Sequence, residues 1–146
     1  MIQYSIARKE HLPGILALYR QLQPDEEALD IIEAEKIWEM SRHQGITYFI
    51  AADDGKVVSS LFLAIIPNMT RGGRSNGFIE NVVTHEDFRG RGYAPALIGR
   101  ASEIAENNHC YKIMLMTGSK QESTLRFYEK CGFNRNDKTA FIKWIK

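Results

Sequence analysis

The most constraining feature of the sequence is a short basic segment with two glycines, Arg89–Gly92, which separates an apolar stretch from a helix-forming one. The stretch before it, Phe78–Thr84, is predicted to be a strand, and Ala94–Ala105 has alanine, leucine and isoleucine at helical spacing. Glycines let a backbone approach a ligand closely, and the free N–H groups at a helix N-terminus attract anions. Because Arg89 and Arg91 add positive charge, the segment predicts a pyrophosphate site.

The segment Arg89–Gly92 has other possible roles. By itself it is also compatible with a solvated basic turn that binds nothing. The dinucleotide-binding fingerprint is disfavoured because Pro95 stands where the third glycine belongs, and a P-loop is excluded because no Gly-Lys-Ser/Thr follows. Pro95 does suit the first turn of the following helix.

The hydrophobic pattern predicts one α/β (α+β) domain over residues 1–146, in which a mixed sheet carries helices on its faces. The expected order of elements is β-α-α-β-β-β-α-β-α-β-β. Besides the two elements around Arg89–Gly92, we expect strands at Ile2–Ala7, Thr47–Ala52, Lys56–Ile66, Tyr111–Thr117, near Phe133 and at Ala140–Ile145, and helices around Leu12–Tyr19, Ala28–Met40 and Ser123–Lys130.

Composition and charge limit the classes of binding partner that the sequence favours. The formal net charge is +1, so no strong field favours nucleic acid or an acidic membrane. No apolar run reaches the roughly 18–20 residues of a membrane span, and no basic and then apolar leader opens the sequence. Cys110 and Cys131 form no C-x-x-C pair, and no histidine cluster has metal-ligand spacing. We therefore expect a cytoplasmic protein without a metal.

Two motifs resemble those of the GNAT superfamily, the GCN5-related N-acetyltransferases. The stretch Glu80–Ala94 resembles motif A, a strand followed by Gln/Arg-x-x-Gly-x-Gly/Ala and a helix, with Arg89, Gly92 and Ala94 at the matching positions. Downstream, Phe127–Phe133 resembles motif B. Two motifs in the right order and at the right separation are much more specific than either alone.

The resemblance implies the GNAT fold: a mixed, mostly antiparallel sheet of six to seven strands, flanked by about four helices and splayed between strands four and five. It also implies acetyl-CoA as cosubstrate. The pantetheine arm would pair with backbone groups of Val82, Val83 and Thr84. Thr124 would either touch the coenzyme or cap its helix. The remaining coenzyme-binding residues implied are Arg89, Gly90, Arg91, Gly92, Tyr93, Ala94, Phe127 and Tyr128.

Acetyl transfer to an amine needs a neutral nucleophile, donors for the tetrahedral oxyanion and a proton for the departing thiolate. The resemblance assigns that last proton to Tyr128, for which an ordinary core aromatic is the alternative. Glu80 is charged within an otherwise apolar strand, which is costly unless the side chain is exposed or functional. We expect Glu80 to act as the base, and His85 is the other candidate.

The acceptor is expected to be a small-molecule amine. Arg71 and Arg74 precede the catalytic strand, and guanidinium groups match phosphate and carboxylate. Together with Glu80 they are candidate acceptor-binding residues, and solvated loop charges are the alternative for the two arginines. The run Ile79–Val83, with Tyr111-Lys112 and Phe127–Phe133, is similar to glucosamine-phosphate N-acetyltransferases, so an amino sugar phosphate is one lead. Those enzymes have an acidic residue where this chain has Asn81, and that departure counts against the specific assignment. A protein or peptide amine, or a catalytically silent acyl-CoA sensor, are the alternatives.

Proteins of the family that the chain resembles commonly form homodimers, so the resemblance implies a possible homodimer. The apolar segment Ala140–Ile145 is suited to pairing or exchange across a two-fold interface.

Overall fold

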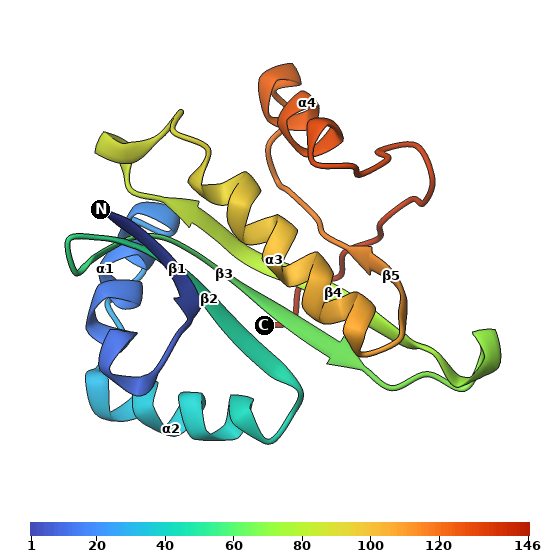
Figure 1. Cartoon of the computed structure of the whole chain (residues 1–146), viewed down its shortest axis with the longest axis horizontal. Coiled ribbons are helices and arrows are strands. Elements are labelled where there is room, and N and C mark those ends of the chain that lie inside the picture. The colour runs from blue at the N-terminus through green and yellow to red at the C-terminus, as the bar shows by residue number, and fades with distance from the viewer.

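The computed structural model covers residues 1–146 and has one sheet of five strands and four α-helices. The strands lie in chain order across the sheet; all neighbours are antiparallel except β4 and β5, which are parallel (Figure 1). None of the helices is long and apolar enough to cross a bilayer. The elements are β1 (Ile2–Ile6), α1 (Leu12–Leu22), α2 (Ile31–Arg42), β2 (Ile46–Asp53), β3 (Lys56–Ile66), β4 (Ser75–Thr84), α3 (Tyr93–Asn107), β5 (Cys110–Met114) and α4 (Glu122–Lys130).

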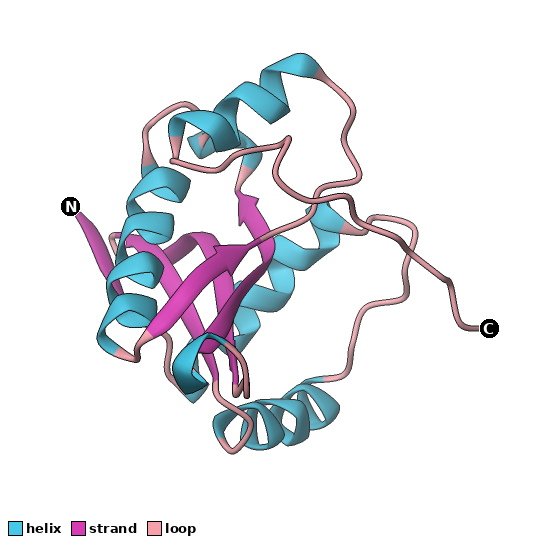
Figure 2. Ribbon diagram, turned by 90° about the vertical axis from the view of Figure 1, so that its right-hand side faces the viewer, coloured by secondary structure: helices cyan, strands magenta, loops and turns pink.

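Two hydrophobic cores hold helices against opposite faces of the sheet. Alternate residues of a strand point to opposite faces, and the central strands β2, β3 and β4 contribute to both cores. One core joins β2, β3 and β4 to α3 through Phe49, Leu61, Ile79 and Leu97. The other joins the opposite face to α1 and α2, with Ile15, Leu18, Trp38, Ile50 and Val57 among its members. The sheet is thus a middle layer between α3 on one side and α1 and α2 on the other (Figures 1 and 2).

The sheet opens between β4 and β5, as predicted. Their parallel pairing runs from Ser75 opposite Cys110 to Phe78 opposite Met114 and then stops. Beyond that point β5 ends and the chain turns away toward α4. The second half of β4, Ile79–Thr84, therefore has β3 on one side and no strand on the other.

The two C-terminal strands of the prediction are absent, so the sheet has five strands and not six or seven. Neither the residues around Phe133 nor Ala140–Ile145 form ladder pairs. The C-terminal segment instead runs away from the sheet (Figure 2), and the side chain of Phe141 is 92% exposed. A strand exists only through its partner, and this segment pairs with no strand of its own chain.

Candidate functional site

A cradle of free backbone N–H groups lies at the start of α3. None of the turn, loop and cap hydrogen bonds of the backbone uses an N–H of Arg89 to Ala94. Gly90 has φ 75° and Gly92, the N-cap residue of α3, has φ 82°. That left-handed conformation favours glycine. Consecutive free amides before a helix N-terminus match the acceptor oxygens and charge of a pyrophosphate.

Arginine side chains are held beside the cradle. Arg89 Nε donates to the carbonyl of Thr84 at 3.3 Å, and Arg91 Nη2 donates to the carbonyl of Asp87 at 3.3 Å. The Arg91 guanidinium also lies 4.8 Å from the centroid of the Phe88 ring. Both arginines are exposed, so each keeps N–H groups free for an anion. His85 has a structural role here, because its Nδ1 accepts from the N–H of Asp87 at 3.1 Å.

A β-bulge interrupts β4 directly after Glu80. Glu80 pairs with Phe62 and Val83 pairs with Ser60, so Asn81 and Val82 together face the single residue Leu61. Asn81 takes a φ of 54°, which a bulge of this kind requires of one residue. The bulge leaves backbone groups without ladder partners at the midpoint of the β4 edge. The free edge, with Val82, Val83 and Thr84, leads from there straight into the cradle.

Glu80 faces the side of the sheet that carries α1 and α2. Its neighbour Ile79 belongs to the α3 core, and adjacent strand residues point to opposite faces. Phe62, directly opposite Glu80, contacts Tyr48, which packs against the α1/α2 core. Glu80 is only half-buried, and no lysine or arginine forms a salt bridge with it. A carboxylate so placed is available to an incoming ligand.

Tyr128 lies on α4, the helix that follows β5. Its ring packs against the α3 core and makes edge contacts with Phe127 and Phe133, at centroid distances of 5.0 and 6.3 Å. Burial, together with the nearby Cys131, raises the pKa of the Tyr128 hydroxyl. The phenol therefore stays protonated and remains a proton donor well into the alkaline range.

Other predicted coenzyme residues surround the opening. Tyr93 and Ala94 form the first turn of α3, and Phe127 packs beside Tyr128 on α4. Thr124 lies in the first turn of α4, where its Oγ1 accepts from Ser119 Oγ at 3.1 Å. The N-cap residue of α4 is Gln121 and no side chain caps the helix, so Thr124 ties the preceding loop to the first turn without capping it.

Arg71 and Arg74 lie at the other end of β4. The Arg74 guanidinium donates to the carbonyl of Cys110 at 2.9 Å, and Arg71 lies 5.3 Å from the centroid of the Tyr111 ring. From Arg74 to Glu80 the strand extends for about 20 Å at about 3.3 Å per residue. The structure therefore brings neither arginine next to Glu80.

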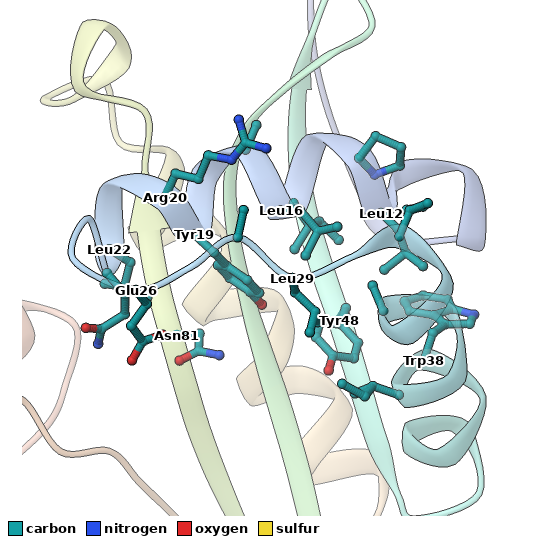
Figure 3. Close-up of a pocket in the computed structure, with 18 of the residues that line it drawn as sticks. Leu12, Leu16, Tyr19, Arg20, Leu22, Glu26, Leu29, Trp38, Tyr48 and Asn81 are labelled. Atoms are coloured by element: carbon teal, nitrogen blue, oxygen red, sulfur yellow. The ribbon is translucent and has the colours of Figure 1, made fainter.

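A cavity of about 800 Å³ lies between α1, α2 and the sheet (Figure 3). Its walls are mostly apolar, and its polar side chains include Tyr19 and Asn81. The Tyr19 hydroxyl is buried, and burial raises its pKa, while the nearby Asn81 side chain lowers the pKa to a lesser extent. Asn81 places this cavity directly beside the bulge and Glu80.

The bulge is the functional feature that the sequence prediction missed. An asparagine inside a run of β-branched and apolar residues is its signal, because asparagine tolerates positive φ far better than valine or isoleucine. Phe62 was missed as well, and nothing local distinguishes it from the other apolar residues of β3. Its position opposite Glu80 is set by the pairing of β3 and β4.

Comparison with known proteins agrees with this geometry. Residues 13–133 match the family model of the acetyltransferase (GNAT) family. The glucosamine 6-phosphate N-acetyltransferase of Trypanosoma brucei brucei is 39% identical over 109 residues, which cover 73% of this chain and 72% of that protein.

Two solved structures have the same fold. An Agrobacterium tumefaciens protein assigned as an acetyltransferase is 40% identical, with a TM-score of 0.90 over 97% of this chain and 99% of its own. A Trypanosoma brucei acetyltransferase is 32% identical, with a TM-score of 0.86 over 99% of this chain and 100% of its own. The amide cradle and the splayed sheet agree with the matched family model. The chain belongs to the GNAT family and is an N-acetyltransferase.

Proposed function

We propose that the protein transfers the acetyl group of acetyl-CoA to the primary amine of a small molecule by direct attack. The observation that carries this proposal is the continuous free edge of β4, which joins the amide cradle at one end to the bulge and Glu80 at the other. The coenzyme pyrophosphate binds the amides of Arg89 to Ala94. The pantetheine arm pairs along Thr84, Val83 and Val82 as an added strand, which places the thioester at the bulge.

The reacting groups then have defined roles. Glu80 removes a proton from the ammonium form of the acceptor, directly or through a water molecule, and the neutral nitrogen then bonds to the thioester carbon. The excess proton on the nitrogen of the intermediate passes to solvent. A backbone N–H freed at the bulge stabilises the negative oxygen of the tetrahedral intermediate. The carbon–sulfur bond breaks, and Tyr128 donates its proton to the departing thiolate. The base faces α1 and α2 and the acid packs on the α3 side, so acceptor and coenzyme approach from opposite faces.

An amino sugar phosphate is one acceptor that this proposal includes. The name of the Trypanosoma brucei brucei relative supports it. Arg74 is about 20 Å along the strand from Glu80 and Arg71 lies in the turn before the strand, so an anionic group held by them belongs to an elongated acceptor. A protein or peptide amine is the alternative acceptor.

Thiol release over a panel of amines tests the proposed function. We expect coenzyme A to appear only when acetyl-CoA and a suitable amine are both present, with one acetylated amine formed per thiol. Calorimetric binding of acetyl-CoA with no amine-dependent thiol release would instead identify a silent acyl-CoA sensor.

We also propose that the protein forms a homodimer through its C-terminal segment. Phe141, Trp144 and Ile145 are 92%, 85% and 84% exposed, which is unusual for large apolar side chains in sequence. The outer edge of β5 pairs with no strand. A cavity of about 300 Å³ beside it is lined by α3, β5 and Cys131–Phe133. The segment of a second copy fits this edge as an added antiparallel or parallel strand.

Sedimentation of the full chain tests the dimer. We expect twice the monomer mass for the natural sequence and the monomer mass for the double variant Phe141→Asp, Trp144→Asp. Met69→Asp is the control, because Met69 is also fully exposed but lies in the loop between β3 and β4. A natural chain that sediments as a monomer at all accessible concentrations contradicts the proposal.

A further inference from the structure

Glu80 and two aromatic residues, Phe62 and Tyr48, lie directly opposite one another on the neighbouring strands β4, β3 and β2, and so form one row across the sheet. Tyr48 of β2 pairs with Phe62 of β3, and Phe62 pairs with Glu80 of β4. The ring centroids of Tyr48 and Phe62 are 5.4 Å apart, and Trp38 of α2 lies 5.4 Å from Tyr48 on the other side. Directly opposite residues in an antiparallel pair have Cβ atoms about 4.5–5.5 Å apart. The Phe62 ring is therefore the immediate neighbour of the Glu80 carboxylate.

Phe62 is not needed by either core. It is half-buried, whereas Leu61 and Leu63 on either side are fully buried. It packs into neither the α3 core nor the α1/α2 core. An aromatic ring therefore remains accessible beside the carboxylate.

The aromatic row continues into the cavity between α1 and α2. Tyr48 and Asn81 both line that cavity (Figure 3). Tyr48 also contacts Phe62, and Asn81 follows Glu80 directly in the chain. The Tyr19 hydroxyl lies in this wall but is fully buried, next to the side chain of Asn81. The surface around Glu80 thus offers an aromatic platform and, beside it, the Asn81 amide, which can hydrogen-bond.

We propose that Phe62, supported by Tyr48, binds the acceptor by stacking under a flat apolar face that lies next to its amine. This inference rests on the proposed function, which assigns Glu80 as the base. The CH face of a pyranose ring and the face of an aryl ring share this chemistry, and both pack favourably on an aromatic side chain. With the amine at Glu80, the body of the acceptor lies over Phe62 and reaches the mouth of the cavity, where Asn81 meets its polar groups.

A small acceptor fits this surface better than a protein segment does. An apolar strand laid over Phe62, such as the C-terminal segment of a second copy, would also cover Glu80, which has no cationic partner. Burying an unpaired carboxylate is costly. A small amine does not leave the Glu80 carboxylate buried and unpaired, because its nitrogen lies against that carboxylate and gives it a proton.

The test compares Phe62→Ala and Phe62→Leu with the control Ile66→Ala. Ile66 lies on the same strand and face, is 45% exposed and pairs with Asn76, away from Glu80. Glucosamine 6-phosphate and 2-phenylethylamine are the two probes. The readouts are calorimetric binding of each amine to the coenzyme A complex, and kcat and KM for thiol release.

We expect at least one probe to bind the natural protein. Phe62→Ala is expected to weaken that binding about tenfold or more and to raise KM by a similar factor with kcat nearly unchanged, since stacking acts equally in the ground and transition states. For Phe62→Leu we expect an amine affinity and a KM between those of the natural protein and Phe62→Ala. Ile66→Ala should have the natural amine affinity and KM, and all variants should bind coenzyme A as the natural protein does. The probe that binds identifies the sugar or the aryl form of the acceptor.

The inference and the proposed function fail in different ways. Amine binding that depends on Phe62 without thiol release supports the inference and contradicts the function. Thiol release with the same KM in Phe62→Ala as in Ile66→Ala supports the function and overturns the inference. Absence of binding by both probes overturns the inference, and so does a Phe62→Ala variant that loses the dimer in sedimentation but keeps its amine affinity.

Discussion

Replacing Tyr128 by phenylalanine is expected to lower kcat by about 10²–10⁴-fold, the range typical of a positioned general acid. The change removes one oxygen and keeps the ring that packs against Phe127 and Phe133. The lost proton transfer belongs to the transition state, so the affinity for acetyl-CoA should hardly change. Steady-state kinetics, calorimetry of coenzyme binding and thermal melting on this variant measure the three quantities.

The control for this substitution is Tyr4→Phe. Tyr4 also packs against the α3 core, but it is on β1 at the opposite edge of the sheet from β5 and α4. We expect natural kcat in that variant. A fall of less than about threefold for Tyr128→Phe, below the weak end of general-acid effects, makes Tyr128 a packing residue and leaves protonation of the thiolate to water.

The pH dependence gives a second check on Tyr128. Burial and Cys131 raise the pKa of its hydroxyl in the folded protein. The acid therefore stays protonated through the pH range in which an ordinary tyrosine, with a pKa near 10, would begin to ionise. We expect kcat of the natural protein to show no alkaline fall until the pH exceeds that ordinary value.

The fold could be predicted from the sequence wherever local pattern decides structure. The hairpin of β2 and β3, the strand before the cradle and the helix after it all follow from periodicity and from the residues that end each element. The helix predicted from Ala28 begins only at Ile31, where Asp30 caps it by accepting from the N–H of Ile32 at 2.6 Å. Asp30 was visible in the sequence as a possible N-cap residue, but several polar residues before it could have capped the helix equally well.

Features that depend on contacts between distant segments could not be predicted in this way. A strand signal at Ala140–Ile145 is real in its residue types, yet the segment pairs with no strand of the same chain. The acceptor side of Glu80 depends on the register between β3 and β4 and on the bulge that shifts it. Likewise, Arg71 and Arg74 were close to the catalytic strand in sequence but lie at its far end in space, because an extended strand separates them from Glu80.

Replacing Glu80 by glutamine is expected to lower kcat/KM for the acceptor by about 10²-fold or more near neutral pH, as loss of a general base does. The amide keeps the size of the side chain and its place opposite Phe62. An alkyl amine is mostly protonated near neutrality, since its pKa lies near that of lysine at about 10.4. A base at the site is therefore needed most where free amine is scarce.

The decisive measurement is the ratio of natural to Glu80→Gln activity as a function of pH. It should be largest near pH 7 and shrink toward pH 10, as solvent takes over deprotonation of the amine. Glu103→Gln, at an exposed position of α3, is the control and should match the natural protein throughout. A ratio that stays constant across this range removes the base role from Glu80 and leaves it a group that orients the acceptor over Phe62, in which case KM and not kcat carries the loss.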